Sequence, residues 1–354
     1  MLTTTLGLLI IALVLLIIFQ LAKTNEMIIA LKGEEEAMHN ANRFNGRMFL
    51  FFLIFGTIAS VWSTFHYAPL YLPVPSSEHG VWLRDMFFWT LVATVPVFFL
   101  THIALFWYSF KYRRDGTNTA YYFPGSNKLE LIWTAIPAVV MILLVYEGLR
   151  SWYKITGPAP QEAVEIEATG QQFFWTLRYG GEDNKIGKKS VKLIGGDNAL
   201  GLDWEDTANH DDFIADEMHI KLGQPVLVRI NAIDVLHSFY LPHFRVKMDA
   251  VPGIPTQFWF TPTKTTKQMR EELNNPDFNY ELACAELCGQ AHFNMRKVVV
   301  VDDEADYNAW KAQQQPIYVK LGLNKTTTPE KTGTGNIENQ PDSDKAQKSK
   351  TSKI

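Results

Sequence analysis

Residues 284–295 read Cys-Ala-Glu-Leu-Cys-Gly-Gln-Ala-His-Phe-Asn-Met, and they contain both cysteines of the 354-residue chain. Thiolates and imidazole are soft donors that favour copper or zinc over magnesium or calcium. Zinc sites use Cys, His and carboxylate ligands, so the methionine three residues after the histidine favours copper. The stretch therefore predicts a copper-binding loop.

The number of donors in this loop bears on the kind of copper site. A mononuclear blue-copper site uses one Cys, two His and a weak axial Met. Here Cys284 and Cys288 are four residues apart, a spacing at which two thiolates can bridge two copper ions. Each copper then needs its own imidazole, and the loop supplies only His292. A disulfide in an oxidising compartment and a zinc site are the alternatives.

The second imidazole must come from elsewhere in the chain. One candidate, His237, lies in a β-prone apolar run, where a histidine is more often a core residue than a ligand. From the residues alone, His237 and His243 are both plausible ligands. The full set of candidates is His210, His219, His237 and His243.

The first 150 residues are dominated by apolar segments, although the whole chain has a net charge of only -4. A membrane-spanning helix needs about 20 mostly apolar residues. The first segment lacks the basic start and the small-residue cleavage site of a signal peptide, so we interpret it as a retained helix. The four segments are residues 3–22, 48–65, 86–110 and 131–149.

The loops between these segments differ in charge. Lys and Arg gather in loops that stay in the cytoplasm. The first and third loops are basic, whereas the second carries only Arg84. Both termini and everything after residue 150 are therefore expected on the outer side. The basic residues of the two inner loops are Lys23, Lys32, Arg43, Arg47, Lys111, Arg113, Arg114 and Lys128.

The second half of the chain has the pattern of a β domain. Short β-prone runs are separated by Gly, Pro, Asn and Asp, which is typical of a sandwich or barrel. We expect a short closing helix at 304–315 and, from residue 323, a disordered polar tail. The predicted strands are 163–168, 172–179, 217–222, 225–231, 236–241, 256–261 and 297–302.

Residues 181–216 are polar and Gly-rich, and they interrupt the strand pattern. Two interpretations stay open: a solvated insertion, or an acidic docking surface for a basic partner. The carboxylates concerned are Glu205, Asp206, Asp211, Asp212 and Asp216.

From the third apolar segment to about residue 312, the chain resembles subunit II of haem–copper cytochrome oxidases, which carries the binuclear CuA centre. Residues 284–295 match the CuA loop, and Asp-Val-Leu-His-Ser-Phe at 234–239 matches the strand that gives the first ligand. Lys-Met-Asp-Ala-Val-Pro-Gly at 247–253 and Glu-Leu-Ile-Trp-Thr-Ala-Ile-Pro at 130–137 also match. The resemblance implies a membrane α-helical part followed by an all-β, cupredoxin-like domain with Greek-key topology.

The resemblance also implies a ligand set. Cys284 and Cys288 would bridge both coppers, and His237 and His292 would cap one each, which leaves His243 as a non-ligand. The remaining implied ligands are weak: Met295 for one copper and the backbone carbonyl of Glu286 for the other. The Glu286 side chain would reach a Mg²⁺ ion shared with subunit I.

The role implied is to accept electrons from a cytochrome c or a c-type haem subunit and to pass them to haem a of subunit I. That step feeds oxygen reduction coupled to proton pumping in a bacterial inner membrane. Glu130 matches a glutamate near the entrance of a proton path. No Cys-x-x-Cys-His motif occurs, so no haem on this chain is expected. Expected partners are subunit I, other oxidase subunits, the electron donor and lipid, but not nucleic acid.

The chain departs from the family pattern at two places. Residues 170–175 read Gly-Gln-Gln-Phe-Phe-Trp where the family has Gly-His-Gln-Trp-Tyr-Trp. Phe173 thus replaces the tryptophan credited with electron uptake. We predict that Phe173 still lies at the donor-facing surface and that Phe173, Phe174 and Trp175 are the electron-entry residues. Two extra apolar segments also precede the usual hairpin. The expected domains are 1–68 (extra helices), 69–152 (hairpin), 153–322 (copper domain) and 323–354 (tail).

Two other functions remain possible from the sequence. A soluble CuA reductase of the nitrous oxide type would need a His-rich copper domain, whereas this chain has nine histidines and membrane segments. A copper-binding or assembly module would need neither Glu286 nor the aromatic run.

Overall fold

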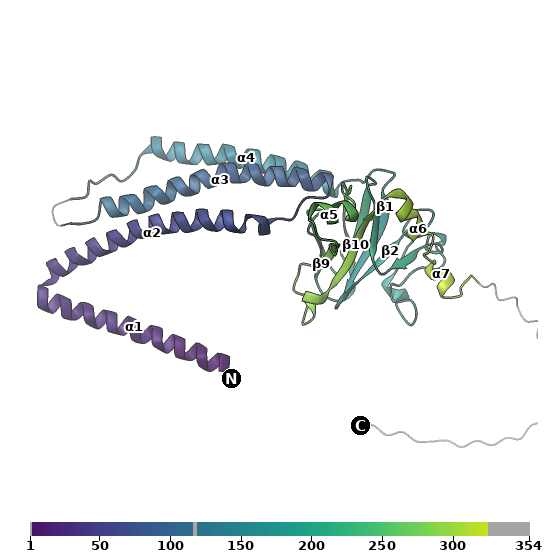
Figure 1. Ribbon diagram of the computed structural model, residues 1–354, viewed down its shortest axis with the longest axis horizontal. Coiled ribbons are helices and arrows are strands. Elements are labelled where there is room, and N and C mark those ends of the chain that lie inside the picture. The colour runs from purple at the N-terminus through teal and green to yellow at the C-terminus, as the bar shows by residue number, and fades with distance from the viewer. Residues whose placement is uncertain (1, 116–118, 325–354) are drawn as a thin grey trace, which may run out of the picture.

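The computed structural model describes residues 2–115 and 119–324, and it consists of a helical part and a β domain (Figure 1). From residue 325 on, the predicted disordered tail lies outside the described residues. The β domain sits beyond one end of the helices, and the chain passes into it from α4.

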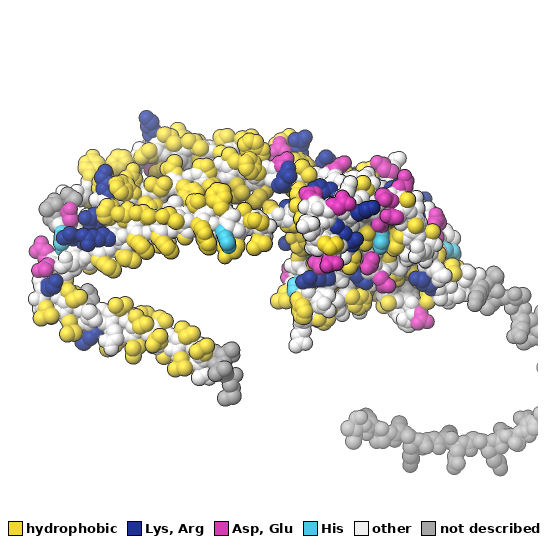
Figure 2. Space-filling view, in the orientation of Figure 1, with side chains coloured by type: hydrophobic (Ala, Val, Ile, Leu, Met, Phe, Trp, Pro, Cys, Tyr) yellow, Lys and Arg dark blue, Asp and Glu magenta, His cyan; other side chains and the backbone are white. Residues whose placement is uncertain are grey.

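The helical part contains four helices long and apolar enough to cross a membrane. They are α1 (Leu2–Lys32), α2 (Glu34–Tyr71), α3 (Glu78–Lys111) and α4 (Asn127–Thr156). Each contains one of the predicted apolar segments. Apolar side chains cover their outer surface, as a lipid environment requires (Figure 2).

The helices are not packed equally. Helices α2, α3 and α4 run alongside one another, whereas α1 turns away from them (Figure 1). The turn lies at Gly33, whose φ of 83° is a left-handed conformation that glycine adopts without strain. The α1–α2 turn and the α3–α4 connection both lie at the end remote from the β domain. This arrangement agrees with the basic loops being on one side of the membrane and the β domain on the other.

The β domain is a sandwich of two five-stranded sheets, as predicted. One sheet has the order β3-β2-β1-β5-β8, and the other has the order β4-β10-β9-β6-β7. The pairs β1–β5 and β4–β10 are parallel, and the other pairs are antiparallel. The strands of the first sheet are β1 (Val164–Gln171), β2 (Phe174–Tyr179), β3 (Phe213–Ala215), β5 (Val226–Ala232) and β8 (Thr256–Phe260). Those of the second are β4 (Met218–Lys221), β6 (His237–Leu241), β7 (Val246–Ala250), β9 (Tyr280–Cys284) and β10 (Arg296–Asp302).

The core between the sheets is built by period-two burial along the strands. In β1, Ile166 and Ala168 are fully buried, and in β5 the same holds for Val226, Val228 and Ile230. Three short helices complete the domain: α5 (Thr266–Glu272), α6 (Glu304–Lys311) and α7 (Ile317–Lys320). Strands β3, β7 and β9 were not predicted from the sequence, and β7 and β9 carry the exposed charged residues Lys247, Asp249 and Glu281.

The helical hairpin is attached to one edge of the first sheet. The Ser77 hydroxyl caps α3 by accepting from the N–H of Gly80, and it donates to the carbonyl of Phe244 at 2.8 Å. The N–H of Glu78 donates to the carbonyl of Thr261, just after β8. Helix α4 also contacts β8. Strand β8 is therefore the sheet edge next to the membrane part, and β3 is the opposite edge.

The predicted insertion at 181–216 is an ordered loop, and its last part forms strand β3. It is organised around Arg178 of β2, a fully buried guanidinium. This side chain donates to Glu167 and Asp212 at 2.9 Å and to Asn209 at 2.8 Å. The insertion is therefore fixed at its base by a buried ion pair, while most of its residues between 182 and 200 remain exposed or half-exposed.

Three of the five carboxylates in the alternative of an acidic docking surface make contacts within the domain, and the alternative is wrong for Asp212, which is buried. Asp211 accepts from the backbone N–H groups at the start of the loop, and Asp206 accepts from the N–H of Lys188. Asp212 is buried against the arginine. Only Glu205 and Asp216 of the five are exposed. Asp206, Asp211 and Asp212 therefore help to hold the loop together.

Candidate metal centre

The site lies where the end of β9 meets the start of β6. Strand pairing places Phe239 opposite Cys284, which brings His237, at the first position of β6, next to the copper loop. The loop runs from Cys284 to Met295 and continues into β10, which pairs with β9 on its other side. Two neighbouring strands therefore hold both ends of the loop and its distant histidine.

Sulfur, imidazole and thioether donors converge in this loop. The two Sγ atoms are 4.0 Å apart. His237 Nδ1 is 3.8 Å from Cys284 Sγ, and His292 Nδ1 is 3.7 Å from Cys288 Sγ. Met295 Sδ is 3.9 Å from Cys288 Sγ. Each thiol thus has its own imidazole, and the loop brings its predicted donors into one cluster.

Burial separates this cluster from water. His237 and Met295 are fully buried, and both cysteines are buried and free. His237, Cys284 and Cys288 place one ligand atom each within 4.8 Å of one another, which is a spacing that one metal ion can occupy. Burial, with the neighbouring Cys284, raises the pKa of Cys288 to about 11. Two buried thiols with imidazoles beside them fit a soft metal ion, which deprotonates thiols on binding.

The orientation of His237 is set by Asp234, a residue that the sequence analysis did not single out. Asp234 Oδ1 is 2.9 Å from His237 Nε2, while Nδ1 faces the thiols. Burial opposes ionisation of Asp234, but hydrogen bonds from the N–H of Gln172, from His237 and from the N–H of Val235 outweigh it and lower its pKa. An ionised Asp234 holds the Nε2 proton and leaves Nδ1 free as a ligand. A carboxylate three residues before a ligand histidine is the sequence signal that could have revealed it.

The turn between β1 and β2 braces the site from the other sheet. Gln172 Nε2 donates to the carbonyl of Cys288 at 2.5 Å. A Cβ atom at Gly170 would lie 3.0 Å from the His237 ring, so glycine permits the close approach of β1. At Gly289, with φ of 145°, a Cβ would lie 2.9 Å from the Phe173 ring. The β1–β2 turn and the copper loop are therefore in direct contact.

The three predicted electron-uptake residues differ in exposure. Trp175 is buried, with its ring edge-to-face against His237 at a centroid distance of 5.9 Å. Phe173 is half-buried against the copper loop, and Phe174 is 47% exposed. The structure thus orders them from surface to site, with Phe174 rather than Phe173 as the most exposed.

Glu286 presents two groups in different directions. Its backbone carbonyl lies 3.2 Å from Cys284 Sγ, whereas Met295 lies beside the other thiol, Cys288. Its side chain is exposed on the surface of the domain. One residue can therefore face the buried site through its backbone and the solvent through its carboxylate.

The other candidate histidines lie outside the cluster. His219 Nδ1 is 2.6 Å from Asp302, and His219 stacks on Trp310. His210 stacks on Tyr318, and His243 packs edge-on against Tyr280. Each of these three packs against an aromatic ring, whereas His237 is the one of the four candidates that lies beside Cys284.

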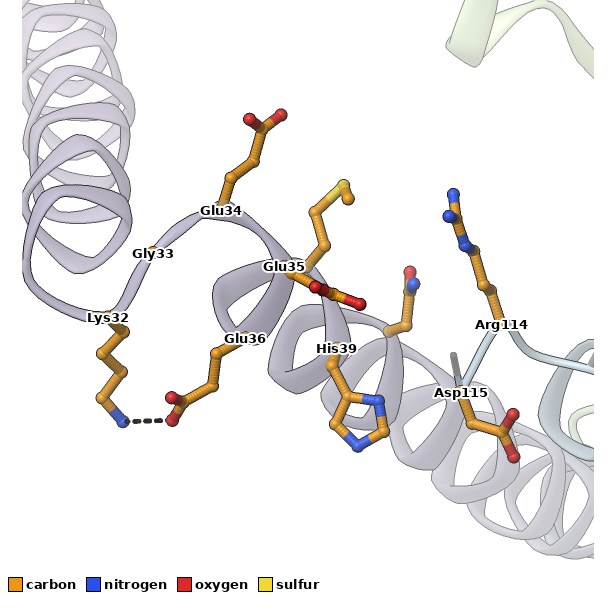
Figure 3. A pocket seen from close by; sticks show the side chains of 10 residues that line it. Lys32, Gly33, Glu34, Glu35, Glu36, His39, Arg114 and Asp115 are labelled. Atoms are coloured by element: carbon orange, nitrogen blue, oxygen red, sulfur yellow. Dashed lines mark ion pairs between the residues drawn. The ribbon is translucent and has the colours of Figure 1, made fainter. Parts of the chain in front are cut away.

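Two further features lie at the remote end of the helices. Glu130 is in the first turn of α4, exposed, with Oε1 3.4 Å from the N–H of Ser126. A cavity of about 580 Å³ opens at the α1–α2 turn. Figure 3 shows it between the acidic run Glu34–Glu36 and Arg114, with Lys32 paired to Glu36 at 3.8 Å. It is remote from the copper loop.

Comparison with known proteins identifies the family. The sequence model described as "Cytochrome C oxidase subunit II, periplasmic domain" matches residues 164–302, and the one described as its transmembrane domain matches residues 65–150. The chain belongs to the cytochrome c oxidase subunit II family. It is therefore a membrane subunit of a haem–copper oxidase complex, with a periplasmic, cupredoxin-like domain.

Two individual relatives agree with this assignment, and one solved structure is similar to part of the chain. The "Alternative cytochrome c oxidase subunit 2" of Bradyrhizobium diazoefficiens is 34% identical over 241 residues, covering 67% of this chain and 80% of that protein. "Cytochrome c oxidase subunit 2" of Thermostichus vulcanus is 29% identical over 286 residues, covering 74% and 83%. The solved periplasmic domain of subunit II from Bradyrhizobium japonicum is 26% identical, covers 43% of this chain and 94% of its own, and has a TM-score of 0.29.

Proposed function

We propose that this chain is the electron-accepting subunit of its oxidase and holds a binuclear copper centre in the loop 284–295. The observation that carries the proposal is the pairing of donors: two thiols 4.0 Å apart, each with its own imidazole within 3.8 Å. A mononuclear blue-copper site needs only one thiolate, and a Cys2His2 zinc site would leave the thioether of Met295, 3.9 Å from Cys288 Sγ, without a role. The donors thus match two soft ions that share two thiolates.

The donor distances suggest how the ligands divide. Cys284 and Cys288 would bridge the two ions. The ion beside Cys284 would take His237 and the carbonyl of Glu286, and the ion beside Cys288 would take His292 and Met295. The two ions would therefore share equal thiolates but differ in their weak ligands, a thioether for one and a carbonyl for the other.

The chain's own residues prepare the site for this role. Asp234 keeps the Nδ1 lone pair of His237 directed at the thiols. Gln172 holds the carbonyl of Cys288, and β6, β9 and β10 fix the loop at both ends. Such a rigid, buried frame changes little when an electron arrives or leaves. A bound copper pair would supply a one-electron carrier between a cytochrome c, or a c-type haem subunit, and haem a of subunit I.

Several further assignments belong to the same proposal. The exposed Glu286 carboxylate would bind a Mg²⁺ ion shared with subunit I, and Glu130 would lie at the entrance of a proton path. Electrons would enter through the 173–175 turn, with Phe173 touching the copper loop. Residues 1–68 would be an addition to the hairpin 69–152 and the copper domain 153–322. The chain would sit in a bacterial inner membrane with the copper domain and both termini outside, and its role would feed oxygen reduction and proton pumping.

The test is the electron paramagnetic resonance of the copper-loaded full chain, in detergent or within its oxidase. One electron shared equally by two copper nuclei of spin 3/2 splits each signal into seven lines, whereas one copper nucleus gives four. We expect seven lines in the wild type. Four lines, or copper that binds without a shared electron, would overturn the binuclear proposal.

A further inference from the structure

The insertion between β2 and β3 is anchored more firmly than a surface connection needs to be. Arg178 forms ion pairs with Glu167 and Asp212, and its Nη2 atom also donates to the carbonyl of Gly187 at 3.1 Å. Gly187 and Asp212, near the two ends of the loop, are therefore joined to the first sheet through one buried guanidinium. Because breaking a buried ion pair is strongly destabilising, this anchoring fixes the base of the loop.

The two limbs of the loop are also bonded to each other. Asn209 Nδ2 donates to the carbonyls of Lys188 and Asp203 at 2.8 and 2.7 Å. The N–H of Ser190 donates to the carbonyl of Gly201 at 2.7 Å, and Asn198 bonds both backbone groups of Leu202. The conformation at the end of the loop is thus set in advance, which reduces the entropy lost when such a surface binds a partner.

The tip of this loop, residues 191–197, carries an exposed aliphatic group. Val191, Leu193 and Ile194 are 84%, 44% and 42% exposed. Every residue from 191 to 197 is exposed, so no other element of the domain covers these side chains. Exposed aliphatic side chains scattered singly are normal, but three in four consecutive residues on a rigid loop indicate an interaction site.

Lysines precede and interrupt the aliphatic group in the sequence. Lys188 and Lys192 are exposed and make no ion pair within the described part of the chain, whereas Lys189 is paired with Glu167 at 2.8 Å. Asp197 is the one carboxylate of the tip. A complementary surface would be an apolar depression bordered by carboxylates.

The position of the loop separates an aqueous partner from a membrane surface. The insertion connects β2 to β3, at the edge of the first sheet opposite β8. Strand β8 is the edge that touches α4. Four strand spacings of about 4.8 Å lie between the two edges. The tip is therefore carried on the side of the domain away from the membrane helices.

We propose that residues 188–197 form a docking knob for a protein outside the membrane, whose contact face is an apolar depression edged by carboxylates. Val191, Leu193 and Ile194 fill the depression, and Lys188 and Lys192 pair with its rim. The knob is independent of the copper loop, so its occupation changes assembly and not the chemistry at the copper site.

Site-specific photo-crosslinking in intact membranes tests this surface. A photoreactive amino acid replaces Leu193 in the full-length chain, and the matched control places it at Leu273, a 40% exposed leucine at the end of α5. We expect one discrete protein adduct from position 193 and none from 273. Sequencing of the adduct should give a protein with an acidic domain on the outer side of the membrane.

Charge reversal then separates docking from chance proximity. Lys188→Glu with Lys192→Glu should lower the adduct yield at least about tenfold, and 0.5 M salt should lower it in the wild type. Lys267→Glu is the charge control, and oxidase turnover with a small-molecule reductant should be unchanged in all variants. An unchanged thermal unfolding temperature shows that the variants fold.

Four outcomes would overturn the proposal. They are the absence of an adduct at 193, adducts with lipid only, adducts with this chain's own tail or a second copy, and a yield indifferent to charge reversal. Because turnover with the small reductant is measured separately, loss of the adduct is distinguishable from failure of the copper centre.

Discussion

The two long connections of the β domain are stabilised in opposite ways. The insertion between β2 and β3 is closed by the chain itself, through the buried pairs of Arg178 with Glu167 and Asp212 at 2.8 and 2.9 Å. The copper loop between β9 and β10 brings thiols, imidazoles and a thioether to distances of 3.7–4.0 Å, where sulfur makes only weak hydrogen bonds. One loop is complete as folded, and the other is arranged to bind a metal.

This difference shows how one scaffold separates stability from function. The buried charges at the base of the insertion, on Arg178, Glu167 and Asp212, form ion pairs with one another, so removing the cation among them should damage the fold. The donors of the copper loop contribute little bonding to each other, so their removal should spare the fold and abolish metal binding. The following substitutions test this contrast.

The largest effect is expected from Cys288→Ser, because it removes one of the two bridging thiols. Binuclear copper binding should be lost, together with the seven-line signal. Without copper, the free energy of unfolding should change by less than about 1 kcal/mol. In wild type, copper at a thousand times its Kd should add about 4 kcal/mol. Chemical denaturation with and without copper measures both quantities. A Cys288→Ser chain that still gives seven lines would contradict the assignment.

Arg178→Met should have the largest effect on the copper-free fold. It leaves Glu167 and Asp212 buried without their cation, which typically destabilises a protein by about 3–5 kcal/mol. The matched control is Arg229→Met, since Arg229 pairs with Glu165 at a more exposed position, where about 1 kcal/mol or less is expected. Urea unfolding of the two variants gives the comparison. Equal losses would mean that the buried network does not anchor the insertion.

Met295→Leu should have an intermediate effect confined to the metal. Both thiols and both imidazoles remain, so copper should still bind with a shared electron. The reduction potential should change, because the weak thioether ligand is replaced by an alkyl group. Redox titration of the copper signal measures the shift. Complete loss of copper would show that Met295 is more than a weak ligand.

Asp212→Asn should have the smallest effect, visible mainly as a change in pH dependence, because the amide oxygen can still accept from Arg178, which keeps its ion pair with Glu167. Burial raises the pKa of Asp212 to about 7, although Arg178 opposes the shift, and its Oδ1 atom has no hydrogen-bond partner. The folded state therefore holds a proton that the unfolded chain, with a pKa of 3.8, releases earlier. This contribution to stability is present at low pH and is lost as the pH rises from about 4 to about 7. Thermal unfolding across this window should show a decline in wild type that is reduced in Asp212→Asn. Identical slopes would mean that Asp212 stays ionised beside Arg178.

The sequence alone carried much of the site and the architecture. Four apolar segments predicted four membrane-length helices, and short β-prone runs predicted the sandwich, because both patterns arise from neighbouring residues. The donor types in 284–295 indicated copper, since ligand chemistry belongs to the side chains themselves. The basic residues of the first and third loops predicted the side of the membrane on which the β domain lies, because this charge pattern is also local to the sequence.

Other features depended on which strands lie side by side. The register of β6 against β9 sets His237 beside Cys284, while His243, two residues beyond the end of β6, packs on Tyr280 instead. Strand β6 begins at His237, and Asp234, in the turn just before it, can therefore reach the imidazole and orient it. The acidic run at 205–216 suggested a docking surface, yet one of its carboxylates, Asp212, is buried against Arg178. Contacts between residues far apart in the chain are fixed by sheet register and burial, and local patterns in the sequence do not carry that information.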